Sequence, residues 1–71
     1  MAEQVYAEMV ANVLSIDVEA GQAVDAGATL LILESMKMEI PVVAETGGVV
    51  SEIKVEPGDV VQEGDVLVVL T

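Results

Sequence analysis

The chain has 71 residues, which suits one small domain spanning residues 1–71, and 54% of these residues are hydrophobic. Because it contains no cysteine and no histidine, disulfide bonds, thiolate zinc sites and imidazole metal ligands are excluded. Thirteen acidic and two basic side chains give a formal net charge of -11, so we expect no nucleic-acid partner, no anionic membrane surface and a monomeric chain.

The ends of the chain and its apolar runs carry no membrane signal. Leu30–Leu33 and Val66–Leu70 fall far short of the roughly 20 apolar residues that span a bilayer. Residues Met1–Gln4 lack the basic start and the apolar run of a signal peptide. We therefore expect a cytoplasmic protein.

Eight short segments are predicted to be strands. Leu14, Ile16 and Val18 alternate with polar residues, which is the strand period of two. The later segments Thr29–Leu33 and Val66–Leu70 are apolar on both faces, as expected for strands that are buried on both sides. In chain order the predicted strands are Val5–Ala7, Val13–Val18, Ala23–Val24, Thr29–Glu34, Met38–Val43, Val49–Lys54, Val60–Val61 and Val66–Thr71.

The two halves of the chain resemble each other. A shift of 37 residues places Gly21 on Gly58 (58 − 21 = 37) and Gly27 on Gly64. It also places the apolar residues Val13, Ile16, Val18, Val24, Leu30 and Leu33 on Val50, Ile53, Val55, Val61, Leu67 and Leu70. We therefore predict one all-β domain made of two similar halves, related by a pseudo-twofold axis and closed as a two-layer sandwich or flattened barrel.

The repeat leaves a segment between the halves, Glu34–Pro41, which is predicted to be a tight hairpin with three or four linking residues. Lys37 then lies at or beside the tip and points into solvent. A lone lysine in a turn is ordinarily only a solvated charge, and we interpret Lys54 in that way.

Lys37 differs from Lys54 because a methionine stands on either side of it, where Gly, Asn, Asp or Ser would build a plain turn. Met36 and Met38 offer the flexible apolar contacts that are found at docking sites. The alternative is that one or both methionines fold back under the hairpin and join the core.

The stretch Glu34-Ser35-Met36-Lys37-Met38-Glu39 resembles the E-[AS]-M-K-M-E signature of the biotinyl carrier domains of biotin-dependent carboxylases. The resemblance covers nearly the whole chain and is closest to single-domain biotin/lipoyl attachment proteins. It implies a flattened β-barrel of two four-stranded antiparallel sheets with pseudo-twofold symmetry. It also implies covalent biotin on Lys37 and recognition of Met36 and Met38, with a weaker role for Glu34, Ser35 and Glu39.

The same resemblance implies a carrier with no catalysis of its own. Its partners would be a biotin protein ligase, a biotin carboxylase and a carboxyltransferase. Two alternatives stay open. One is a lipoyl carrier of an oxo-acid dehydrogenase or glycine-cleavage type system, although that sister family usually has D-K-A where this chain has M-K-M. The other is an unmodified β-domain used only for protein interaction.

The start of the chain departs from the family pattern. Family members commonly show A-P-M-x-G there, whereas this chain has Ala7-Glu8-Met9-Val10-Ala11. Glu8 replaces a proline and Ala11 a glycine, so the first turn is expected to differ in detail.

Overall fold

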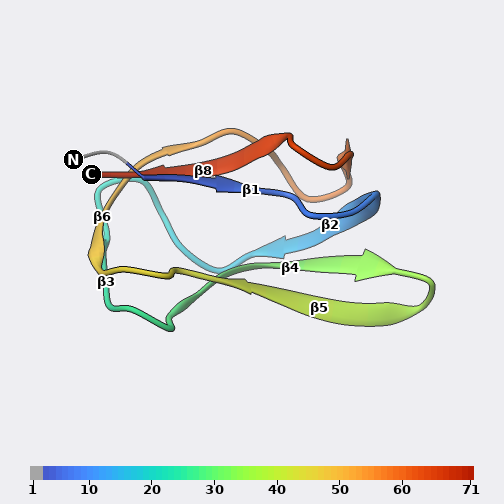
Figure 1. Cartoon of the computed structure of the whole chain (residues 1–71), viewed down its shortest axis with the longest axis horizontal. Helices are drawn as coiled ribbons and strands as arrows, with labels where there is room; N and C mark the ends of the chain where they lie inside the picture. Colours follow the sequence, from blue (N-terminus) through green and yellow to red (C-terminus); the bar gives the residue numbers. More distant parts are fainter. Residues whose placement is uncertain (1–2) are drawn as a thin grey trace.

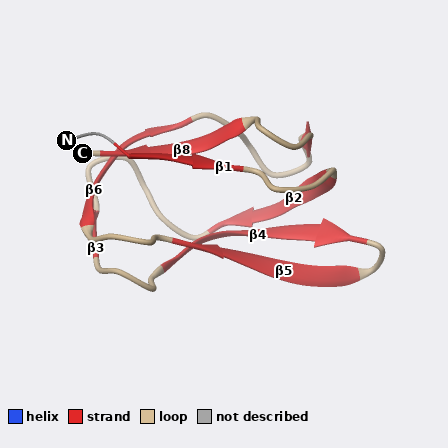
Figure 2. Ribbon diagram, in the orientation of Figure 1, coloured by secondary structure: helices blue, strands red, loops and turns tan. Residues whose placement is uncertain are grey.

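The computed structural model describes residues 3–71, and all eight predicted strands are present in it. Their ribbons are shown in Figures 1 and 2, and no helix occurs within residues 3–71. The all-β expectation is therefore confirmed. The strands are β1 (Glu3–Tyr6), β2 (Ala11–Ile16), β3 (Ala23–Val24), β4 (Thr29–Ser35), β5 (Met38–Val43), β6 (Gly48–Ile53), β7 (Val60–Val61) and β8 (Val66–Leu70).

The strands form two four-stranded sheets in which every neighbouring pair is antiparallel. One sheet has the order β1-β8-β6-β3 and the other the order β5-β4-β2-β7. The repeat found in the sequence takes each strand of one sheet onto the strand at the same place in the other sheet. The expectation of two four-stranded sheets with pseudo-twofold symmetry is therefore confirmed.

The two halves are hydrogen-bonded into each other at equivalent positions. The Gly21 N–H donates to the Val50 carbonyl at 2.7 Å, and the Gly58 N–H donates to the Val13 carbonyl at 2.8 Å. The second glycine turns behave in the same way, with Gly27 bonded to Ala44 at 2.7 Å and Gly64 bonded to Ala7 at 2.9 Å. Each half thus supplies hydrogen-bond acceptors to the backbone N–H groups of the other half. Neither half has a complete hydrogen-bond network alone.

The core lies along β4 and β8, the two strands predicted to be buried on both faces. Consecutive residues are fully buried in both strands, since Leu30, Leu31, Leu67 and Val68 are each 0% exposed. No polar or charged residue within residues 3–71 is buried. The core is therefore entirely apolar, and no buried hydrogen-bond network directs its packing.

Strand β2 differs from its prediction in three ways. It begins at Ala11 instead of Val13 and ends at Ile16 instead of Val18. Leu14 is 43% exposed, although its alternation with polar residues suggested an inward face. A bulge between Val13 and Ser15 shifts the register against β4, and an equivalent bulge lies between Val50 and Glu52 in β6. A bulge interrupts the alternation of side chains between the two faces, so Val13 is buried in place of Leu14.

The ends of the described chain and the β4–β5 turn lie at opposite ends of the molecule (Figure 1). Glu3 at the start of β1 pairs with Leu70 at the end of β8, so the two ends of the described chain are neighbours. The molecule measures 32 × 18 × 18 Å, and Figure 1 places the turn and the chain ends at the two ends of the long axis.

Gly21→Ala and Gly58→Ala should each lower the free energy of unfolding by about 1 kcal/mol, because an L-residue is strained at positive φ. The φ angles are +92° and +96°, and a Cβ at either site meets no atom within 4 Å, so only backbone strain is tested. Urea denaturation measures the change. Gly21→Asn is the matched control and should lose less, because asparagine tolerates positive φ better. Equal stability of Gly21→Ala and the wild type would contradict this interpretation.

Leu67→Ala should lower the free energy of unfolding by about 3 kcal/mol, because it removes a fully buried side chain and leaves a cavity. Thermal and urea unfolding followed by circular dichroism would measure the loss. Leu14→Ala removes the same atoms from a side chain that is 43% exposed, and we expect about 1 kcal/mol or less there. Similar losses for the two variants would show that β8 is not the centre of the core.

Candidate functional site

The six residues singled out by the sequence lie together at the end of the β4–β5 hairpin. Ser35 pairs with Met38 and Glu34 pairs with Glu39, so these four residues are the last two rungs of the ladder. Met36 and Lys37 alone form the turn, because β4 ends at Ser35 and β5 begins at Met38. The linking segment therefore has two residues, and the prediction of three or four was wrong, because the ladder extends closer to the tip than the apolar pattern indicated.

Both turn residues have a left-handed backbone. Met36 has φ +53° and Lys37 has φ +65°, and they are the two non-glycine residues with positive φ within residues 3–71. Positive φ at both central residues defines a type I′ turn, whose twist matches the twist of the flanking strands. Asn-Gly is the usual sequence for this turn, and each L-residue there costs about 1 kcal/mol or more. The sequence at the tip is therefore not optimised for stability of the turn.

The side chains at the tip lie in solvent. Met36 is 92% exposed and Met38 is 65% exposed, so the alternative in which they join the core is wrong. Lys37 is also exposed. Two large apolar side chains held in water beside a strained turn have no role in packing, and such local strain is typical of functional sites.

The amine of Lys37 has no ionic partner within residues 3–71. The one salt bridge in this part of the chain joins Lys54 Nζ to Glu52 Oε2 at 2.7 Å, with the side chains 45% and 58% exposed. This surface pair agrees with the interpretation of Lys54 as a solvated charge and contributes little to stability. Lys37 therefore presents an accessible primary amine.

Glu34 and Glu39 lie directly opposite each other across the ladder, so two like charges are neighbours just behind the tip. Such a pair is mildly destabilising in a sheet. Glu34 is half-buried and Glu39 is exposed, and no hydrogen bond within residues 3–71 involves either carboxylate. These carboxylates are therefore available for a partner that carries positive charge.

Residues 3–71 offer neither a metal site nor a membrane-spanning helix. This part of the chain has no group of three or more acidic side chains that could hold a metal ion. It also has no helix that is long and apolar enough to cross a membrane.

The left-handed backbone of Met36 and Lys37 was not anticipated from the sequence. It follows from the pairing of Ser35 with Met38, which only the structure shows, because a two-residue loop between paired strands normally requires a type I′ or II′ turn.

Comparison with known proteins decides what kind of domain carries this hairpin. A family model described as biotin-requiring enzyme, the biotin/lipoyl attachment model, matches residues 1–70. The chain belongs to the biotin/lipoyl attachment family. A relative in Mycobacterium leprae, called biotinylated protein TB7.3 homolog, is 51% identical over 71 residues and covers 100% of both chains. The biotin/lipoyl attachment protein of Bacillus subtilis is 48% identical over 64 residues, covering 90% of this chain and 88% of the relative.

Solved structures of other proteins share the fold. The urea carboxylase of Kluyveromyces lactis matches with a TM-score of 0.94 and 34% identity over 100% of this chain, but the chain spans only 6% of that carboxylase. The lipoyl domain of the 2-oxoglutarate dehydrogenase complex of Azotobacter vinelandii matches with a TM-score of 0.78 and 27% identity, covering 94% of this chain and 95% of that domain. The same fold therefore occurs in part of a carboxylase and in a lipoyl domain.

Met36→Asn should raise the free energy of unfolding by about 0.5 to 1 kcal/mol, because asparagine tolerates the left-handed backbone that methionine resists. Urea denaturation measures the gain. Met38→Asn is the control, since position 38 lies in β5 outside the turn and asparagine is disfavoured in strands. If both substitutions destabilised equally, the turn would not be strained at Met36.

Proposed function

We propose that this chain is a biotin carboxyl carrier in which Lys37 holds biotin through an amide bond. The observation that carries the proposal is the exposed amine of Lys37, which has no ionic partner within residues 3–71 and lies between two exposed methionines on a strained two-residue turn. Membership of the biotin/lipoyl attachment family supports the proposal, and so do relatives whose names call them biotinylated proteins.

The residues at the tip fit covalent attachment. The neutral amine of Lys37 attacks the carboxyl carbon of biotin after a ligase has activated it with ATP. The nitrogen–carbon bond forms, the activating group leaves with its bonding electrons, and the amine releases a proton to solvent. Because the turn projects from the narrow end of the molecule, it enters a partner active site without any unfolding of the sheets.

The attached group supplies the carboxyl-transfer chemistry when it is bound, whereas this chain supplies position and reach. The lysine stem is a flexible tether, and the hairpin holds the base of that tether on paired strands. Tethering raises the effective concentration of the carried group at each partner site. Met36 and Met38 act as recognised flanks, while Glu34, Ser35 and Glu39 contribute more weakly.

The partners in this proposal are a biotin protein ligase and the biotin carboxylase and carboxyltransferase components of a carboxylase. Residues 1–71 serve as a single carrier domain, monomeric and cytoplasmic, with no catalysis of its own. The similarity to a lipoyl domain favours lipoyl attachment as a second candidate. The M-K-M sequence at the tip favours biotin over lipoate.

Co-expression with a biotin protein ligase and biotin should add one biotinyl mass to the wild-type chain and none to Lys37→Arg, because arginine cannot form the amide. Intact-mass spectrometry and streptavidin blotting are the measurements. Lys54→Arg is the matched control and should be labelled fully, since Lys54 is held in a surface ion pair away from the tip. Labelled Lys37→Arg would defeat the assignment. A lipoyl mass on protein purified from its own cells would favour the second candidate.

A further inference from the structure

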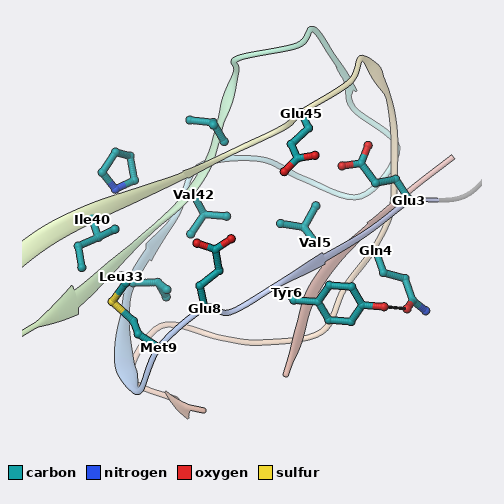
Figure 3. Close-up of a pocket in the computed structure, with 12 residues that line it drawn as sticks. Glu3, Gln4, Val5, Tyr6, Glu8, Met9, Leu33, Ile40, Val42 and Glu45 are labelled. Atoms are coloured by element: carbon teal, nitrogen blue, oxygen red, sulfur yellow. Dashed lines mark hydrogen bonds between the residues drawn. The ribbon is translucent and has the colours of Figure 1, made fainter. Parts of the chain in front are cut away.

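A groove runs between β1 and β5, the edge strands of the two sheets (Figure 3). These strands pair with β8 and β4 respectively and not with each other, so a seam is left between the sheets. The groove has a volume of about 490 Å³, which is large enough for several side chains of a partner.

The floor of the groove is apolar. Val5 from β1 and Val42 from β5 face each other across it in Figure 3, and Leu33 and Ile40 continue the floor toward the β4–β5 hairpin. Tyr6 and Val43 line it as well and are 49% and 43% exposed. This is the type of surface that interfaces use for their central contacts.

Carboxylates surround this floor. Glu3, Glu8 and Glu45 line the groove, and no lysine or arginine does. Glu3 accepts a hydrogen bond from the Thr46 hydroxyl. Within residues 3–71, Glu8 and Glu45 accept none, so their charges are available to a partner.

The charge pattern excludes several occupants. A second copy of this chain would bring another net charge of -11 against the same carboxylates. Nucleic acids and anionic lipids are repelled for the same reason. The groove instead complements a protein segment that carries apolar side chains for the floor and lysine or arginine for the edges.

Pro41 indicates how such a segment binds. It lies in β5, where proline removes a backbone donor, and proline in a strand is found mainly on edges that are protected from further pairing. The partner therefore binds by filling the groove with side chains and not by adding a strand to β5.

One end of the groove lies toward the hairpin tip, whereas Glu3 lines its other end near the chain ends. Ile40 is three residues from Lys37, and an extended strand rises by roughly 3.3 Å per residue, so the near end of the groove lies about 10 Å from the turn. An enzyme that fills the groove thus holds Lys37 next to its own active site.

We propose that this groove is the docking surface for a basic and apolar segment of the ligase that loads Lys37. The proposal rests on the function proposed above and adds the surface that selects the partner. Attraction between the carboxylates and the basic segment speeds the association of the two proteins. The apolar floor provides specificity for that segment, and the hairpin tip places the Lys37 amine in the active site of the ligase.

Steady-state biotinylation of the purified full chain by a biotin protein ligase tests the proposal at low and high salt. Glu8→Gln/Glu45→Gln should raise KM for the carrier about tenfold at low salt with kcat unchanged, as expected for the loss of two partly exposed ion pairs. The dependence of KM on salt should fall as well.

Tyr6→Ala should raise KM without changing its salt dependence, because it removes an apolar contact.

Glu19→Gln/Glu56→Gln is the matched control, because it removes the same charge from two exposed turn residues outside the groove. It should leave KM near the wild-type value. Equal KM values and salt dependence for the groove and control variants would overturn the docking surface while leaving attachment at Lys37 intact. Absence of biotin on every variant and on the wild type would instead overturn the proposed function. A dimeric wild-type chain in sedimentation that becomes more dimeric in Glu8→Gln/Glu45→Gln would show that a second copy fills the groove.

Discussion

The structure depends on the exchange of backbone hydrogen bonds between its two halves. The first glycine turn of each half bonds to the second strand of the other half, Gly21 to Val50 in β6 and Gly58 to Val13 in β2. The second turns repeat the exchange. Each sheet also contains two strands from each half, so neither half can form a complete sheet without the other. A chain of 71 residues with no disulfide gains cooperativity in this way without a large core.

The paired strands of the domain explain why a strained turn is tolerated at the tip of the β4–β5 hairpin. The strands β4 and β5 are paired up to Ser35 and Met38, so the left-handed turn is held by a ladder whose inner end lies in the core. The cost of two L-residues at positive φ falls on Met36 and Lys37 alone. Rigidity at the base and exposure at the tip are therefore separate properties, supplied by different residues.

Much of the fold could be predicted from the sequence because its pattern is local and repeated. The glycine turns, the doubly buried strands and the hairpin with its lysine all appear in short stretches of residues. The bulge at Leu14 could not be predicted, because it depends on the register against β4. The type I′ geometry depends on how far the ladder extends, and the groove joins Val5 to Val42, residues far apart in the chain that only the packing of two sheets brings together.

The position of the chain ends determines how such a unit can be built into larger assemblies. Glu3 and Leu70 are paired at one end of a molecule 32 Å long, and the lysine projects from the other end. A host polypeptide joined at β1 or β8 would therefore not crowd the amine. The domain could rotate about this junction. The amine would then move on an arc whose radius is the long dimension of the domain. The length of the domain would add to the reach of the lysine side chain. The amine could then contact active sites that lie far apart in a larger assembly.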